Sequence, residues 1–134
     1  MTSGEDGSRS RRGFLHSRAR SFGYAFAGLR YALGQPNFRI QILIGVAALI
    51  LAAVIRVQSA EWLALILVSV AVLLMEMLNT AIEALVDLAS PDYHPLARTV
   101  KDVTAGAVLL AALAAVIVGV YVFGPRLVHL VGWR

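Results

Sequence analysis

The chain has 134 residues, enough for one domain, and 59% of them are hydrophobic. Soluble domains contain roughly 45–50% apolar residues, so the mean hydropathy of +0.76 favours lipid over water as the surrounding solvent. The absence of cysteine excludes disulfides, thiolate metal sites and cysteine nucleophiles. The net charge of +4 comes mainly from arginines at one end of the chain and beside apolar segments. This distribution indicates membrane topology rather than nucleic-acid binding.

The N-terminal part begins with a polar stretch, residues 1–13, which is predicted to be a disordered cytoplasmic tail. Residues 14–34 are predicted to form an amphipathic helix in the membrane interface, with its arginines toward anionic headgroups. A surface helix of a soluble bundle is the alternative interpretation of this pattern. The apolar positions follow helical spacings of four, three and four: Phe22, Phe26, Leu29 and Leu33.

Three apolar segments follow, over about residues 38–57, 61–89 and 101–123. Each reaches the roughly 20 residues that a spanning helix needs. Turn-forming segments separate them, and Gly124-Pro125 is predicted to stop the third. We therefore predict an all-α membrane protein, with an N-terminal amphipathic interfacial helix plus three transmembrane helices in one membrane domain over residues 14–134.

Positive charge is divided unequally between the two sides of this arrangement. Nine of the twelve cations fall on the side of the N-terminus and of the 89–100 loop, and three fall on the other side. Because cytoplasmic segments carry the excess of Lys and Arg, the N-terminus is predicted to be cytoplasmic and the C-terminus outside.

The second span carries polar side chains on one helical stripe. At about 100° per residue they lie within roughly 60° of Glu76: Asn79, Thr80, Glu83 and Asp87. Glu76 follows Trp62, an interfacial aromatic at the opposite end, by about 21 Å along the axis at a rise of 1.5 Å per residue. In a hydrocarbon core about 30 Å thick, Glu76 is expected inside the membrane near its cytoplasmic face and Glu83 at the membrane–water boundary.

Three carboxylates on one stripe of a membrane helix must be neutralised by a cation, a metal ion or protonation, because an ionisable group in a span is costly. The position of Glu76 suits a general base. Glu83, nearer to water, suits a hard ion such as Mg²⁺, which binds carboxylate and phosphate oxygens. The alternative interpretation is that these groups make structural hydrogen bonds between helices.

Polar residues near the start of the third span lie on the same cytoplasmic side. Lys101 is expected to neutralise a polyphosphate or to pair with Glu83, while Asp102 also suits the first turn of a helix through the helix dipole. His94, in the preceding loop, is a candidate phosphate contact, with a merely solvated histidine as the alternative. The small residues that follow Gly106 permit close helix packing and oligomer formation.

The stripe and the residues after it resemble a known family. The string E-M-L-N-T-A-I-E-A-L-V-D over residues 76–87, with Asp92-Tyr93-His94 and Lys101-Asp102 downstream, is similar to the bacterial integral-membrane diacylglycerol kinase and undecaprenol kinase family. The resemblance runs from about residue 23 to residue 123 and includes Asn37-Phe38-Arg39.

This resemblance implies a homotrimer in the bacterial cytoplasmic membrane, each chain having an interfacial helix and three spans. It implies transfer of phosphate from ATP to a lipid alcohol at the cytoplasmic interface, with Mg²⁺ as cofactor. Glu76 would be the catalytic base on the lipid hydroxyl and Glu83 a Mg²⁺ ligand. Asn79 and Asp87 would order the site.

The resemblance also assigns residues to the two substrates. The positions associated with ATP are Tyr24, Glu83, Asp92, His94, Lys101 and Asp102. Phe38 and Arg39 fall near the expected lipid entrance, and Glu76 would contact the lipid. Thr80 and the loop at residues 94–97 favour undecaprenol over diacylglycerol as the lipid.

Gln35 departs from the family pattern, because the family often has a metal-ligating glutamate at this position. A neutral amide oxygen is a weaker ligand for Mg²⁺. The metal would then rely more on Glu83 and on the ATP phosphates, or the turn would shift and another group would substitute.

Two other classes of function remain as alternatives. A small ion- or proton-coupled membrane transport protein would also place carboxylates in a span, but three spans without paired broken helices are a poor transporter. A membrane assembly subunit would explain the small residues and leave the carboxylate stripe unexplained. No nucleic-acid partner is expected.

Overall fold

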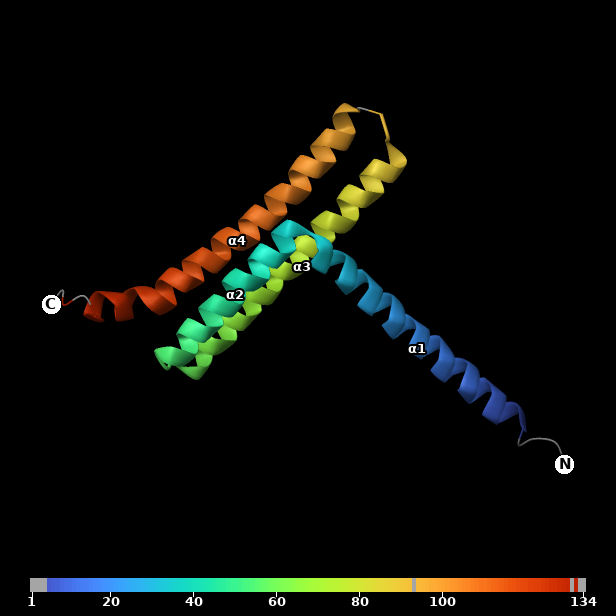
Figure 1. Ribbon diagram of the computed structural model, residues 1–134, viewed down its shortest axis with the longest axis horizontal. Coiled ribbons are helices and arrows are strands. Elements are labelled where there is room, and N and C mark those ends of the chain that lie inside the picture. Colours follow the sequence, from blue (N-terminus) through green and yellow to red (C-terminus); the bar gives the residue numbers. More distant parts are fainter. Residues whose placement is uncertain (1–4, 93, 131, 133–134) are drawn as a thin grey trace. The chain divides into compact units, whose positions relative to one another are not determined.

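The computed structural model describes residues 5–92, 94–130 and 132, and the elements within them are all helical. They are α1 (Glu5–Gly34), α2 (Pro36–Val54), α3 (Ser59–Ala89) and α4 (Pro95–Leu130) (Figure 1). The chain divides into two compact units: the first contains α1 and ends at Gln35, and the second begins at Pro36 and contains the other three helices. The predicted all-α class is confirmed.

Helix α1 begins earlier than predicted, at Glu5 rather than at residue 14. Residues 5–13 of the predicted disordered tail therefore lie in a helix, while residues 1–4 lie outside the described part of the chain. The placement of α1 in the membrane interface stays a prediction.

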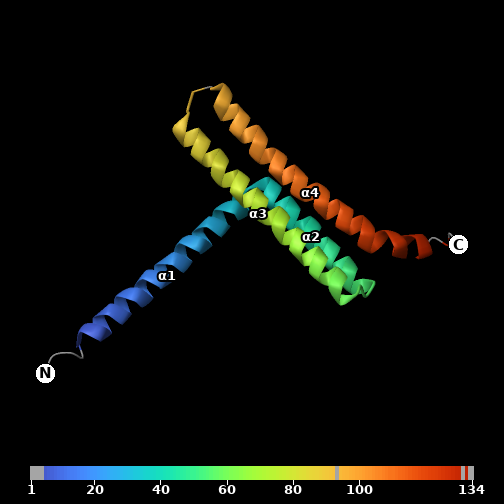
Figure 2. The ribbon, with the colours of Figure 1, turned by 180° about the vertical axis from the view of Figure 1, so that it is seen from behind.

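The second unit contains three helices that are long and apolar enough to cross a membrane: Pro36–Val54, Ser59–Ala89 and Pro95–Val128. This confirms the three predicted spans. Helix α3 packs against both α2 and α4, and Figures 1 and 2 show it side by side with each of them. A buried apolar cluster joins the three helices at the end where α2 turns into α3: Ala52, Val57, Leu65 and Val122.

Helix α2 ends at Val54, before the predicted limit at residue 57, because a Schellman turn closes it. The Val57 N–H donates to the Ala52 carbonyl oxygen at 3.2 Å, and the Arg56 N–H donates to Ala53 at 3.3 Å. Arg56 has a φ of 54°, the left-handed conformation that this turn requires. The turn buries Val57 against the cluster.

Helix α4 starts at Pro95, earlier than the predicted residue 101, because the preceding histidine caps it. The Leu96 N–H donates to His94 Nδ1 at 3.2 Å, and the Arg98 N–H donates to the His94 carbonyl oxygen at 3.2 Å. Proline is accepted at the first helical position, where its missing N–H has no partner to lose. The connection from α3 is therefore shorter than the sequence predicted.

The prediction that Gly124-Pro125 stops the last helix is wrong, since α4 continues through Pro125 to Leu130. Proline removes one backbone donor and crowds the preceding turn, and Figure 1 shows the last turns of α4 bending there. The Arg126 side chain holds this segment in place. Its Nη1 donates to the Val122 carbonyl oxygen at 2.6 Å and to Glu61 Oε1 at 2.8 Å, and its Nη2 donates to Glu61 Oε2 at 2.7 Å.

Glu61 therefore has two structural tasks at the start of α3. It accepts the two-pronged hydrogen bond from Arg126, and its Oε2 accepts the Gln58 backbone N–H at 2.7 Å. An acidic side chain in the first turn that bonds back to the cap residue satisfies a donor that the helix leaves unpaired. The ion pair thus fixes both the beginning of α3 and the end of α4.

We predict that Arg126→Met and Glu61→Gln each lower the midpoint of thermal unfolding in detergent. The double variant should lose less than the sum of the two single losses, because both changes break the same ion pair. Circular dichroism during heating measures the midpoints. The exposed Arg56→Met, at the same end of the second unit, serves as the matched control and should change little; equal losses for Arg56→Met and Arg126→Met would contradict the assignment.

Candidate functional site

The polar stripe of α3 turns toward the interior of the second unit at Glu76 and Asn79. These are the two buried polar or charged side chains of the described residues, with exposed fractions of 4% and 8%. Glu83 is partly buried and Asp87 is exposed. The stripe therefore runs from a buried end at Glu76 to an exposed end at Asp87.

Glu76 is hydrogen-bonded across to the neighbouring helix. Gln41 Nε2, from α2, donates to Glu76 Oε2 at 3.1 Å. Gln41 was not among the predicted site residues, although it is the one polar side chain in residues 40–54. That isolated amide in an apolar span was the signal that could have identified it, because such groups need a hydrogen-bond partner.

Asn79 and Glu83 are joined one helical turn further along. Asn79 Nδ2 donates to Glu83 Oε1 at 2.9 Å, the i, i+4 contact that a helix surface allows. The amide oxygen of Asn79 is buried and has no hydrogen-bond partner among the described residues. A buried acceptor without a hydrogen bond lowers the stability of the fold by about 1–3 kcal/mol. The presence of this amide oxygen is therefore not explained by its contribution to stability.

Lys101 pairs with Asp87 rather than with Glu83, one of its two predicted partners. Its Nζ makes a hydrogen-bonded ion pair with Asp87 Oδ1. The short connection between the antiparallel helices α3 and α4 places the exposed end of the stripe, not its middle, level with Lys101. Arg98 was not among the predicted site residues. Its Nε lies 3.7 Å from Asp102 Oδ2 within α4.

A pocket of about 360 Å³ lies at the connection of α3 and α4. His94 lines it, and because its Nδ1 accepts the Leu96 N–H, Nε2 is the ring nitrogen left to meet a ligand. Four of the six predicted ATP residues meet here, whereas Glu83 does not line the pocket. The lining residues are Val86, Asp87, Ser90, Pro91, Asp92, His94, Ala97, Arg98, Lys101 and Asp102.

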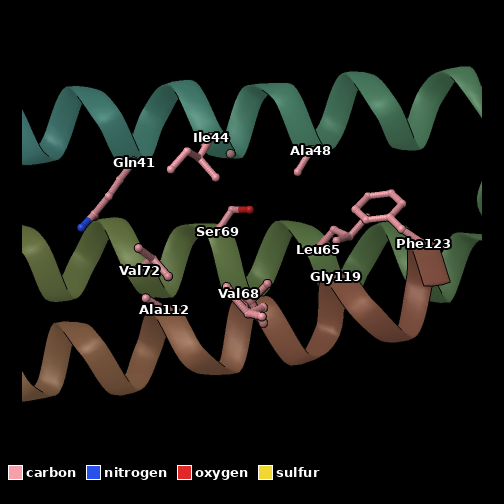
Figure 3. A pocket seen from close by; sticks show the side chains of 13 residues that line it. Gln41, Ile44, Ala48, Leu65, Val68, Ser69, Val72, Ala112, Gly119 and Phe123 are labelled. Carbon is pink, nitrogen blue, oxygen red and sulfur yellow. The ribbon is translucent and has the colours of Figure 1, made fainter. Parts of the chain in front are cut away.

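A second, apolar cavity of about 320 Å³ lies between α2, α3 and α4. Gln41 lines one end of it and Phe123 the other, and small residues of α2 and α4 form much of its wall, among them Gly45, Ala48 and Gly119. Figure 3 shows Gln41 reaching from α2 toward α3 at the edge of this cavity. The Gln41 amide, which donates a hydrogen bond to Glu76, thus lies beside the apolar cavity.

The remaining predicted residues are not brought to this site by the contacts of the second unit. Tyr24 and Gln35 belong to the first unit, with Tyr24 exposed on α1 and Gln35 just after it. Phe38 is buried and Arg39 exposed in the first turns of α2. Their predicted roles toward ATP, metal and lipid stay predictions.

The described side chains suit Mg²⁺ only as an ion that phosphate oxygens and water also coordinate. Within the described residues, no group of three or more acidic or histidine side chains is placed to hold a metal. Mg²⁺ is commonly bound by one or two carboxylates together with phosphate oxygens and water. Glu83, beside the unpartnered oxygen of Asn79, supplies this kind of incomplete oxygen set.

Comparisons with known proteins agree with the motif. The sequence model described as prokaryotic diacylglycerol kinase matches residues 23–123. The chain is 47% identical over 112 residues to a diacylglycerol kinase of Synechocystis, 35% identical over 121 residues to the undecaprenol kinase of Bacillus subtilis, and 36% identical over 96 residues to the diacylglycerol kinase of Escherichia coli. These matches cover 82%, 90% and 71% of this chain, and 64%, 98% and 79% of the relatives. The chain thus spans less than two thirds of the Synechocystis protein, and the predicted resemblance is confirmed.

We predict that Asn79→Leu leaves the midpoint of thermal unfolding unchanged or raises it. Leucine keeps the branched shape of asparagine, although it is larger, and it removes a buried acceptor without a partner, while the partly exposed Glu83 can still bond water. Leu65→Ala is the control that shows the measurement detects core damage, with an expected loss of about 2–5 kcal/mol. A loss of similar size for Asn79→Leu would show that the amide is structural.

Proposed function

Because the chain belongs to the prokaryotic diacylglycerol kinase family, we propose that it uses ATP and Mg²⁺ to phosphorylate the hydroxyl group of a membrane lipid alcohol at the cytoplasmic interface. The family and the named relatives are lipid kinases. The identity of the lipid, the Mg²⁺ requirement and the assignment of residues to each step belong to the proposal.

The observation that carries this proposal is the order of polar groups along α3. Glu76 is buried among apolar residues, Glu83 follows about 10 Å further along the helix at 1.5 Å per residue, and the charged pocket at the connection of α3 and α4 comes next. A lipid hydroxyl reaches a protein from the membrane, whereas ATP reaches it from water. A polar stripe with a buried base at one end and charged groups at the other serves both substrates.

In the proposed reaction Glu76 acts as the general base. It takes the proton of the lipid hydroxyl as the oxygen forms a bond to the γ-phosphorus, and the bond from that phosphorus to the bridging oxygen of ADP breaks. Phosphoryl transfer depends on positioning and charge neutralisation more than on covalent help from the protein. Burial of Glu76 excludes water, which would otherwise compete with the lipid hydroxyl.

The charged pocket is the proposed location of the nucleotide. Lys101 and Arg98 supply positive charge toward phosphate, and His94 offers a ring N–H donor. Binding of ATP would redistribute the contacts that Lys101 and Arg98 now make with Asp87 and Asp102. Glu83 would hold Mg²⁺ together with the phosphates, and the ion would neutralise charge that develops on them.

Different features favour undecaprenol and diacylglycerol as the lipid alcohol. Thr80 and the loop at residues 94–97 favour undecaprenol, and the relative from Bacillus subtilis has the name undecaprenol kinase. The more similar relative from Synechocystis has the name diacylglycerol kinase. We propose undecaprenol as the first lipid to test and diacylglycerol as the second.

The proposed setting is the bacterial cytoplasmic membrane, with the N-terminus and the α3–α4 connection on the cytoplasmic side. The unequal distribution of Arg and Lys supports this orientation. A homotrimer is proposed from the family resemblance. Large apolar side chains exposed on all three helices of the second unit fit contacts with lipid and with other copies of the chain.

The function is tested by following transfer of radiolabelled phosphate from ATP in detergent, with undecaprenol and diacylglycerol offered side by side. We expect a labelled lipid product with one or both, and loss of the product when EDTA removes Mg²⁺. ATP consumption that does not depend on added lipid alcohol would contradict the proposal. Ion movement in proteoliposomes without any lipid product would favour the transport alternative.

We predict that Glu76→Gln lowers turnover by about 10²–10⁴-fold, the usual contribution of a general base, while ATP binding and thermal stability are largely kept. Glu61→Gln is the matched control, because it makes the same carboxylate-to-amide change in α3, near the start of the helix and away from the polar stripe. Below its unfolding midpoint it should retain turnover. Near-normal turnover of Glu76→Gln would exclude Glu76 as the base.

A further inference from the structure

Gln41 has no role in the reaction described so far, yet it is an amide placed in an apolar span. Residues 40–54 are otherwise apolar or glycine. A primary amide in such a segment is unfavourable unless its donors and acceptor are satisfied. Gln41 is only partly satisfied, since its Oε1 is buried without a hydrogen-bond partner among the described residues.

The hydrogen bond to Glu76 fixes the orientation of the Gln41 side-chain amide. Gln41 Nε2 lies 3.1 Å from Glu76 Oε2, and a carboxylate oxygen accepts hydrogen bonds but donates none when ionised. The nitrogen must therefore face the carboxylate, and the amide oxygen faces away. The bond also constrains Glu76, because it ties one carboxylate oxygen to α2 and leaves Oε1 as the oxygen that can take a proton from substrate.

We propose that Gln41 is a positioning residue that holds the Glu76 carboxylate in the orientation needed to take the proton of the lipid hydroxyl. This inference rests on the proposed function, and on Glu76 as its base. A glutamate side chain has three rotatable bonds, and burial alone does not select one direction for its carboxylate. A hydrogen bond from a neighbouring helix does select one.

The surroundings of the pair argue against a role in packing alone. The cavity beside Gln41 is lined mainly by apolar residues of α2, α3 and α4, including Ile44, Leu65 and Val72, and Figure 3 shows Ile44 pointing from α2 toward α3. Apolar residues of similar volume at positions 41 and 76 would pack there without any buried polar group. An amide whose oxygen remains unpartnered is explained better by the direction it imposes on Glu76.

The first test compares Gln41→Met with the wild-type chain, normalised to folded protein in detergent. Methionine keeps the length of the side chain and removes the donor. We expect kcat to fall by about 10- to 100-fold, the usual effect of losing a group that orients a reacting residue, with KM for ATP unchanged. Ser69→Ala is the matched control, because Ser69 lines the same cavity and should keep the wild-type kcat.

The second test asks whether Gln41 acts through Glu76. In a Glu76→Asp background the shorter carboxylate can no longer meet the amide, so adding Gln41→Met should cause little further loss of kcat. The same fold loss in both backgrounds would overturn the proposal, as would an unchanged kcat or a change confined to KM for ATP. If Gln41→Met does not fold, Gln41→Ser replaces it, since serine is accepted in spans and is too short to reach Glu76.

Different results would refute the proposed function and the role of Gln41. A wild-type chain that makes no lipid product in the assay refutes the proposed function. A wild-type chain that makes the product, together with a fully active Gln41→Met, refutes only the role of Gln41.

Discussion

A carboxylate buried between apolar helices must find a hydrogen bond or a counter-charge, and this constraint acts on Glu76. Its exposed fraction is 4%, and the donor that meets it comes from Gln41 on the neighbouring helix. The same requirement links α2 to α3 at the buried end of the stripe. Towards the other end, where the side chains reach water, Asp87 finds its counter-charge in Lys101.

Two glutamates of α3, Glu61 near its start and Glu76 near its middle, differ in how completely their hydrogen bonds are satisfied. Glu61 is fully engaged, with a backbone donor from Gln58 and both prongs of the Arg126 guanidinium. Within the described part of the chain, the Glu76 carboxylate accepts one hydrogen bond, from an amide that is itself incompletely satisfied. Complete satisfaction stabilises a fold, whereas spare hydrogen-bonding capacity next to a buried carboxylate leaves room for a substrate.

The charged pocket and the buried glutamate both belong to the pair of helices α3 and α4, an arrangement that suits the two substrates of opposite solubility in the proposed reaction. The cap that His94 provides starts α4 directly after the connection. This early start brings Arg98 and Lys101 into the pocket with Asp92. The family relationship assigns lipid phosphorylation to proteins of this kind, and the hairpin offers a geometry in which it can occur.

The sequence by itself determined the class of the protein, the three spans and the inward stripe on the middle helix. These properties depend on composition and on the 3.6-residue period, both of which are local to one segment. The motif also identified Glu76, Asn79 and Glu83 as candidate site residues.

Tertiary structure decided which groups meet across helices, because partner choice depends on the register between segments far apart in the chain. Lys101 meets Asp87 rather than Glu83, and Gln41 meets Glu76. The continuation of α4 beyond Pro125 depends on the ion pair between Arg126 and Glu61, which lie 65 positions apart. No local rule for proline predicts that a distant glutamate will hold the following turn, so the buried stripe was visible in the sequence while the residues that support it were not.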